Sequence, residues 1–128
     1  MEEAEARARQ GSPAWVYQLD WGSPLEGGKF GAFHTLDIPL VFDNIQAPGS
    51  RTGEGADAQA LSEQMSGMLI ALARQGDPNH AGIPQWTPYG LERRETMVFD
   101  VTPRLEYDPR GGERKLYQRA PFIQRGTF

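Results

Sequence analysis

A histidine in a glycine-led loop is the residue of this chain best suited to chemistry. His34 is one of two histidines among 128 residues, and it ends the stretch Gly31-Ala32-Phe33-His34, directly ahead of an apolar run. An imidazole has an unperturbed pKa of about 6.5, so it can accept and return a proton near neutral pH. His34 is therefore a candidate general base and acid. On residue type alone, a lone histidine in an apolar loop is more often a structural hydrogen-bonding residue, so both interpretations stay open.

The remaining polar residues suggest less chemistry. His80 stands in a polar loop after a helix stop, and we expect it to be exposed and without function. Asp77 and Asn79 fit hydrogen bonding at the end of that helix. Two distant histidines and scattered carboxylates lack the ligand spacing of a metal site, and no phosphate-binding glycine motif precedes a helix. We therefore expect no metal and no cofactor.

Composition limits the class of protein. A length of 128 residues fits a single domain, residues 1–128. The formal charge of −4 gives no electrostatic reason to expect a nucleic acid or an anionic membrane as partner. No apolar run approaches the roughly 20 residues that span a bilayer. The acidic start, Met1 to Glu5, predicts no signal peptide, which makes the cytoplasm the default location. The absence of cysteine excludes disulfides and thiolate metal sites.

Two helices are predicted from the pattern of residues. Residues 2–10 are rich in Ala, Glu and Arg and stop at Gly11, and alanines are the only residues available for packing. Residues 57–75 form an amphipathic helix with Asp57 as N-cap, Gly76 as C-cap and Pro78 just beyond. Its apolar stripe, at three- and four-residue spacing, is core packing: Leu61, Met65, Met68, Leu69, Leu72 and Ala73.

Strands and loops alternate between these helices and after them. We predict strands over 15–21 and 95–101, the second with one buried face and an extension at 105–107, and an extended segment over 82–89 anchored by Trp86. Residues 22–29 and 46–56 read as loops. The segment 30–45 has no decisive periodicity, although Pro39 argues against a central strand. Apolar residues near the end need a partner surface if ordered: Phe122, Ile123 and Phe128.

Several motifs occur in the order found in one enzyme family. They are an aromatic strand (Trp15–Trp21), a glycine-led His loop (Gly31–His34), an acidic residue three positions later (Asp37), an apolar run ending in Phe (Pro39–Phe42), a helix end leading into Gly-Asp-Pro-Asn (Ala73–Asn79), Trp-x-Pro-Tyr (Trp86–Tyr89) and a strand with Thr-Met-x-Phe (Thr96–Asp100). An ordered set is far more specific than one short motif. The chain resembles the type-B carboxylesterases, the cholinesterase and para-nitrobenzyl esterase-like branch of the α/β-hydrolases.

The resemblance implies a fold and a role for His34. It implies the C-terminal segment of an α/β-hydrolase, which taken alone is an α+β structure: two or three edge strands and two main helices. It also implies that His34 is the general base and acid of a Ser–His–acid triad, while Asp37 lies outside the triad in a supporting or structural role.

The remainder of a triad is not found in this sequence. No Gly-x-Ser-x-Gly frame surrounds any serine, and the glycine-rich oxyanion segment is missing too. In the family the triad acid precedes the histidine by more than the 33 residues available here, so Asp20, Glu26 and Asp37 do not correspond to it.

These points predict the C-terminal part of a carboxylesterase that supplies the histidine and is inactive alone. The expected partners are an N-terminal esterase chain or a second copy, with no nucleic acid and no membrane. The alternative is a non-catalytic binding or assembly module derived from an esterase, whose exposed apolar edge pairs with another chain.

Overall fold

A computed structural model describes residues 2–120 of the chain, and the predicted apolar contacts of Phe122, Ile123 and Phe128 lie outside the described residues. The elements follow in this order: α1 (Glu2–Arg9), β1 (Val16–Leu19), a 3-10 turn η1 (Leu25–Gly28), α2 (Asp37–Val41), α3 (Ala56–Gln75), β2 (Glu95–Phe99), β3 (Arg104–Tyr107) and α4 (Gly111–Arg119). None of the described helices is long and apolar enough to cross a membrane.

One small mixed sheet organises the described residues, with strand order β1-β2-β3. β1 pairs with β2 in parallel, Val16 opposite Thr96, and β2 pairs with β3 antiparallel, Met97 opposite Leu105. The prediction of one buried face for β2 is wrong, because all five of its residues are buried. β2 is the central strand, with β1 on one edge and β3 on the other, and its two polar residues Glu95 and Thr96 are buried with the apolar ones.

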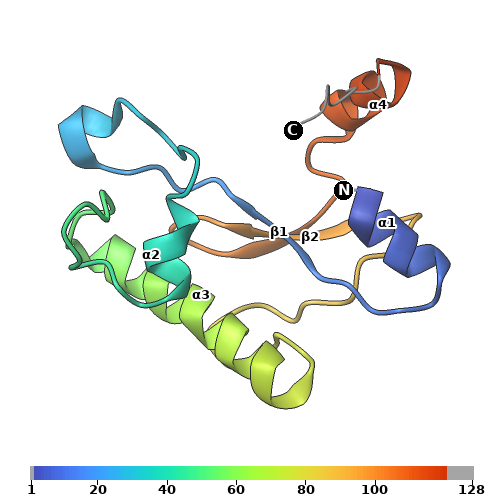
Figure 1. Cartoon of the computed structure of the whole chain (residues 1–128), viewed down its shortest axis with the longest axis horizontal. Helices are drawn as coiled ribbons and strands as arrows, with labels where there is room; N and C mark the ends of the chain where they lie inside the picture. The colour runs from blue at the N-terminus through green and yellow to red at the C-terminus, as the bar shows by residue number, and fades with distance from the viewer. Residues whose placement is uncertain (1, 121–128) are drawn as a thin grey trace, which may run out of the picture.

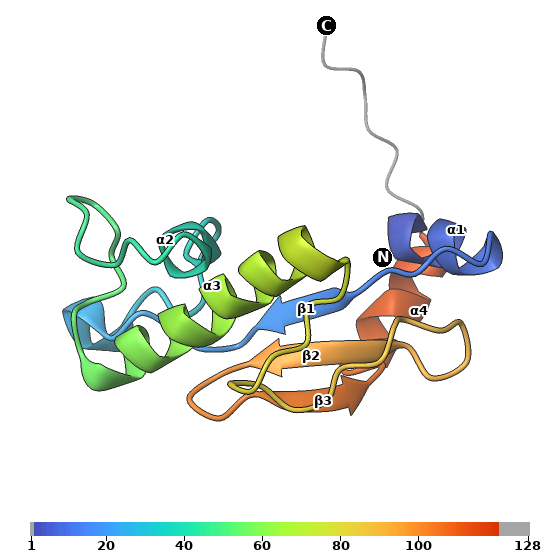
Figure 2. The ribbon, with the colours of Figure 1, turned by 90° about the horizontal axis from the view of Figure 1, so that it is seen from below.

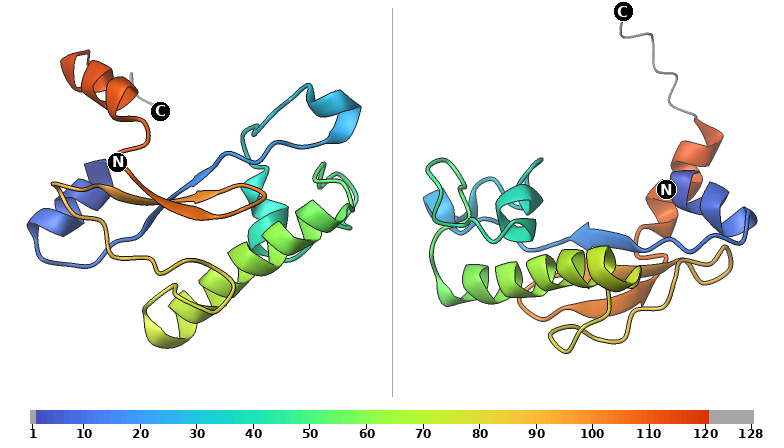
Figure 3. Two further views of the ribbon diagram at one scale, coloured as in Figure 1. Left: turned by 180° about the vertical axis from the view of Figure 1, so that it is seen from behind. Right: turned by 60° about the horizontal axis from the view of Figure 1, so that its bottom comes forward.

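The helices divide between the sides and the ends of this sheet. In Figure 1 the sheet is seen nearly edge-on, with α3 and the segment after it on one side and α4 on the other. Figures 2 and 3 show α1 and α4 close together at one end, while α2 and the loops around it lie at the opposite end. The expected α+β architecture is confirmed, with α2 and α4 as helices beyond the two predicted from the sequence.

The hydrophobic core lies between α3 and one face of the sheet. Met97 and Phe99 point to the same face because alternate residues of a strand do so, and both are fully buried. They belong to one cluster with residues of α2, α3 and the loops before and after these helices: Trp21, Leu36, Leu40, Ile45, Ala58, Leu61, Met65, Met68, Ile83 and Trp86. Core packing is confirmed for Leu61, Met65 and Met68 of the predicted stripe. Its last two residues, Leu72 and Ala73, are exposed, and Leu72 lines a groove beside β1.

The boundaries of α3 differ from the prediction at one end only. Gly76 ends the helix in the left-handed conformation at φ 75°, and its N–H donates to the carbonyl of Leu72, as predicted. Asp57 is not the N-cap. The helix begins at Ala56 after an extended Gly55, with no side-chain cap.

The undecided segment 30–45 contains the short helix α2. Pro39 stands in its first turn, where a missing N–H breaks no helical hydrogen bond. Leu36 and Leu40 are fully buried against the core, which fixes α2 on α3. Pro39 therefore lies in a helix and not in a central strand, as predicted.

Asn79 closes the segment that follows α3. Its side-chain amide accepts from the N–H of Trp86 at 2.7 Å and donates to the carbonyl of Trp86 at 2.8 Å, while Asp77 Oδ1 accepts from the N–H of Asn79. Helix-end hydrogen bonding by this pair is thus confirmed. The Trp86 ring, 2% exposed, packs edge-on against Phe99 and anchors the segment as predicted.

His80 is half-buried rather than exposed, which corrects the prediction. Its Nδ1 accepts from the N–H of Gly82 at 3.1 Å, so Nε2 carries the proton and donates to the carbonyl of Gln64 at 3.0 Å. A Cβ on Gly67 would lie 2.7 Å from the His80 ring, and one on Gly82 would lie 2.8 Å from it. The ring therefore fits closely between two glycines from different segments.

We predict that Gly67→Ala destabilises the chain by about 1–2 kcal/mol, because the added methyl displaces a ring whose two nitrogens are both bonded. Urea unfolding measures the change. Gly112→Ala in α4 is the matched control, since nothing lies within 4 Å of its added Cβ. Adding His80→Ala to Gly67→Ala should recover part of the loss. An unchanged unfolding midpoint for Gly67→Ala would contradict the close fit.

Candidate functional site

His34 lies in a turn that is fixed at both ends. The carbonyl of Gly31 accepts from the N–H of Ser23, and Leu36, two residues after His34, is fully buried. Between them, Thr35 has a left-handed backbone at φ 73°, and the N–H of Leu36 donates to the carbonyl of Phe33. His34 itself is exposed. The sequence thus folds into an anchored turn that presents an imidazole to solvent.

Asp37 connects this turn to the sheet. As the first residue of α2, it accepts a hydrogen bond from the hydroxyl of Tyr17 on β1, with 2.8 Å between the two oxygens. Burial, followed by the hydrogen bond to Asp37 and the charge of that carboxylate, raises the pKa of Tyr17 to about 12. The Tyr17 ring packs edge-on against Phe99 at 6.0 Å. The predicted residues His34 and Asp37 therefore share one short segment, and Tyr17 joins them from a strand.

Four of the five serines of the described residues form hydrogen bonds that serve the fold. Ser23 and Ser50 donate to backbone carbonyls of the two loops, Ser62 donates to the carbonyl of Leu40, and Ser66 bonds within α3. Over residues 2–120, no hydrogen bond joins His34 to a serine or to a carboxylate. Nor does this part of the chain contain a cluster of three or more His, Asp or Glu residues that could hold a metal.

Comparison with protein families decides the assignment. The model of the carboxylesterase family matches residues 1–117, which includes every element up to α4. The chain belongs to the carboxylesterase family.

Individual relatives agree with this assignment. The chain is 31% identical over 109 residues to the para-nitrobenzyl esterase of Bacillus subtilis, an alignment that covers 81% of the chain and 21% of the relative. It is 33% identical over 100 residues to the phenmedipham hydrolase of Pseudarthrobacter oxydans, covering 74% and 20%. The chain therefore spans about a fifth of the length of these relatives.

Solved structures show the same fold over part of their length. A Clostridium hathewayi esterase that can hydrolyse aliphatic aromatic polyesters matches with a TM-score of 0.81 and 30% identity, over 93% of this chain and 23% of its own. A carboxylesterase of Geobacillus stearothermophilus matches with a TM-score of 0.76 and 35% identity, over 90% and 24%. The described sheet and helices are thus part of an α/β-hydrolase structure.

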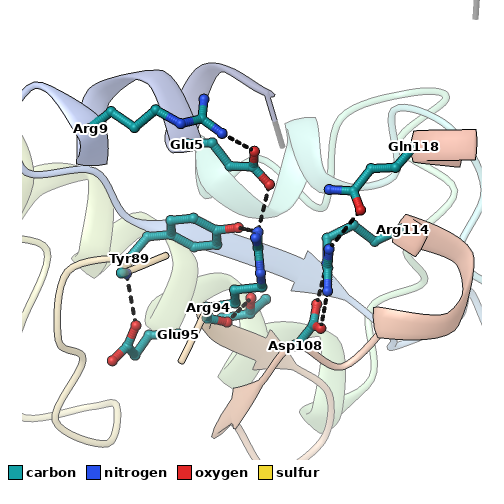
Figure 4. Close-up of polar contacts among 10 residues, drawn as sticks. Glu5, Arg9, Tyr89, Arg94, Glu95, Asp108, Arg114 and Gln118 are labelled. Atoms are coloured by element: carbon teal, nitrogen blue, oxygen red, sulfur yellow. Dashed lines mark hydrogen bonds and ion pairs between the residues drawn. The ribbon is translucent and has the colours of Figure 1, made fainter. Parts of the chain in front are cut away.

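A second polar cluster of this carboxylesterase chain lies at the end where α1 and α4 meet (Figure 4). Arg94 Nη1 lies 2.6 Å from Glu5 Oε1 of α1 and 2.6 Å from the hydroxyl of Tyr89, while Arg9 Nη2 binds the other Glu5 oxygen at 2.9 Å. Glu5 is buried, which corrects the prediction that α1 packs through alanines alone. Because Glu5 and Arg94 are far apart in sequence, no local pattern could reveal their pairing.

The cluster extends to β3 and α4. Asp108, just after β3, accepts from Nε and Nη2 of Arg114 at 2.9 and 2.8 Å, and the N–H of Asp108 donates to the carbonyl of Arg94. Such paired geometry is the strong form of an ion pair. Since none of the residues of α4 is buried, this pair is its main tie to the sheet. The cluster therefore has a structural role.

Acid should weaken the ion pair between Glu5 and Arg94 in this cluster. The hydrogen bond from Arg94 holds the pKa of Glu5 below its usual value of 4.5. A lowered carboxyl pKa adds stability that is present above the unfolded pKa and is lost as pH falls through the folded one. We expect Glu5→Gln to cost about 1–2 kcal/mol in urea unfolding at pH 7 and much less below pH ~4.

The control for this prediction is Glu3→Gln in the same helix, because Glu3 is exposed. It should leave the unfolding midpoint nearly unchanged at both pH values. A cost for Glu5→Gln that is the same at pH 7 and well below pH ~4 would show that the carboxylate charge of Glu5 does not hold α1.

Proposed function

We propose that this chain is the C-terminal part of a carboxylesterase and supplies His34 as the general base and acid of ester hydrolysis. The observation that supports this most is the anchored, solvent-exposed turn carrying His34 within the region that matches the family. The nucleophilic serine, the triad acid and the oxyanion donors would come from the remaining part of the enzyme, since the sequence of this chain has no Gly-x-Ser-x-Gly frame.

In this proposal His34 moves a proton twice. It accepts the proton of the serine hydroxyl as that oxygen attacks the ester carbonyl, and returns it to the oxygen of the departing alcohol. In the second half-reaction it takes a proton from water, whose oxygen attacks the acyl-enzyme, and returns it to the serine. Asp37 stays outside these transfers, because its carboxylate is bound by Tyr17.

The outer edge of β1 is the proposed contact with the remaining part of the enzyme. Among the described strands β1 pairs only with β2, so its other edge has unpaired backbone groups. An open groove of about 530 Å³ runs beside it, lined by Ala14 to Tyr17 and by residues of α1 and α3. The indole N–H of Trp15 there is buried without a partner among the described residues. A strand added along β1 would cover this edge.

We predict that mixing the chain with an N-terminal esterase fragment that carries the Gly-x-Ser-x-Gly motif and the triad acid restores hydrolysis of a p-nitrophenyl ester. His34→Ala in the chain should abolish the restored rate, because a serine without its base is a weak nucleophile. Asp37→Asn should cost far less. Full activity with the His34→Ala chain would reject the role of His34 and favour a non-catalytic assembly module.

The chain alone supplies the baseline for this test. Without a nucleophile and oxyanion donors it should hydrolyse the ester no faster than its His34→Ala variant. A saturable rate in the isolated chain that is blocked by a serine-directed organophosphate would contradict the need for a partner.

The uncovered edge and groove also predict association of the isolated chain. We expect dimers or larger species at micromolar concentration in sedimentation velocity, because β1 offers a free edge beside an open, partly apolar groove. Val16→Lys, a charge on the edge strand, should shift the distribution toward monomer. A monomer at all concentrations for the unmodified chain would contradict this prediction.

A further inference from the structure

We propose that Tyr17 is a positioning residue for the His34 turn, acting through its hydrogen bond to Asp37; the proposal rests on the function proposed above for His34. Tyr17 is neither in the turn nor near it in sequence, and its hydroxyl meets Asp37 Oδ2 at 2.8 Å. It would hold the histidine in place without touching the substrate.

The backbone between Asp37 and His34 is held by hydrogen bonds, so a shift of Asp37 is passed on to His34. Two overlapping turns link them, with the N–H of Leu36 donating to the carbonyl of Phe33 and the N–H of Ile38 donating to that of Thr35. Within residues 31–37 of the described chain, Asp37 is the only residue whose side chain forms a hydrogen bond. A displacement of Asp37 would therefore move the residues that carry the imidazole.

The apolar contacts of the turn do not replace the hydrogen bond between Tyr17 and Asp37. Leu36 and Leu40 fix α2 against α3 on the core side, and the N–H of Ser23 binds the carbonyl of Gly31 at the start of the turn. The bond between Asp37 and Tyr17 adds a further attachment, from the turn to the sheet. This attachment is the one formed by a side chain of the segment that carries His34, so its loss should change the orientation of the turn.

Tyr17 itself is held firmly. β1 sets its backbone opposite Met97 in the parallel pair, and its ring packs edge-on against Phe99, a fully buried residue of the central strand. Its hydroxyl keeps its proton at neutral pH, and burial together with Asp37 raises its pKa further, to about 12. The donor is thus fixed in place and constant in protonation over the range in which an imidazole titrates.

The first test measures steady-state kinetics in the reconstituted enzyme. Tyr17→Phe retains the ring and its packing on Phe99 and removes only the donor. We expect kcat to fall roughly three- to thirtyfold with little change in KM, because the histidine is misplaced while substrate binding is not. Tyr117→Phe, an exposed tyrosine on α4, should have no effect.

A double-mutant cycle tests whether Tyr17 acts through Asp37. Asp37→Ala should lower kcat as Tyr17→Phe does, and the double variant should be no worse than the more impaired single variant. Asp37→Asn, which retains an oxygen to accept from Tyr17, should recover most of the rate. Additive losses in the double variant, or an unchanged kcat for Tyr17→Phe, would overturn the proposal.

A second measurement on the chain alone separates this proposal from the proposed function. The chain has two histidines, so its Cε1–H region in an NMR spectrum has one signal for His34 and one for His80. Tyr17→Phe should shift or broaden the His34 signal and leave that of His80, which is bonded elsewhere, unchanged. If reconstitution yields no activity, the proposed function fails while this spectrum still decides the role of Tyr17. Identical spectra would overturn it.

Discussion

The parallel pairing of β1 with β2 is the contact on which the other elements depend. It joins Val16 to Thr96 and Leu19 to Phe99, so residues from opposite halves of the chain lie side by side. A parallel pair requires a crossover connection, and α2, α3 and the segment closed by Asn79 form that crossover. The turn with His34 is part of it. The position of the histidine therefore depends on the pairing of β1 with β2 and on α2 packing against α3.

The chain attaches its helices by two different kinds of contact. α2 and α3 bury leucine and methionine side chains in the core, a non-directional contribution that depends little on pH. α1 and α4 are held by Glu5 with Arg94 and by Asp108 with Arg114, which are directional and need ionised carboxylates. The hydrogen bond to Arg114 keeps the pKa of Asp108 below its usual value, just as Arg94 does for Glu5. The end of the sheet with α1 and α4 should therefore loosen in acid before the core does.

The sequence predicted what local patterns encode. Gly76 was correctly predicted as the C-cap of α3, because a left-handed conformation favours glycine. The stripe from Leu61 to Met68 was correctly predicted to pack in the core, and so was Trp86, the largest apolar residue of its segment. Contacts between distant segments gave no such pattern. Alternation could not show that β2 is central, and nothing near His80 signals two glycines around its ring. His34 and Asp37 came from an ordered family resemblance, but Tyr17 needed the fold to bring a strand beside the turn.

The exposure of His34 affects what this chain and what the remaining part of the proposed enzyme would each contribute to the active site. A general base works best in a water-excluded site where its partners are preorganised, and this chain offers a turn open to solvent. By itself, the chain can fix the orientation of the turn that carries His34. Leu36 holds this turn on the core side, and the hydrogen bond between Tyr17 and Asp37 holds it on the sheet side. The tautomer of the ring and the exclusion of water would have to come from the surface that covers it. In the proposed enzyme the chain therefore contributes a histidine of defined orientation, and its partner contributes the environment that makes the histidine a base.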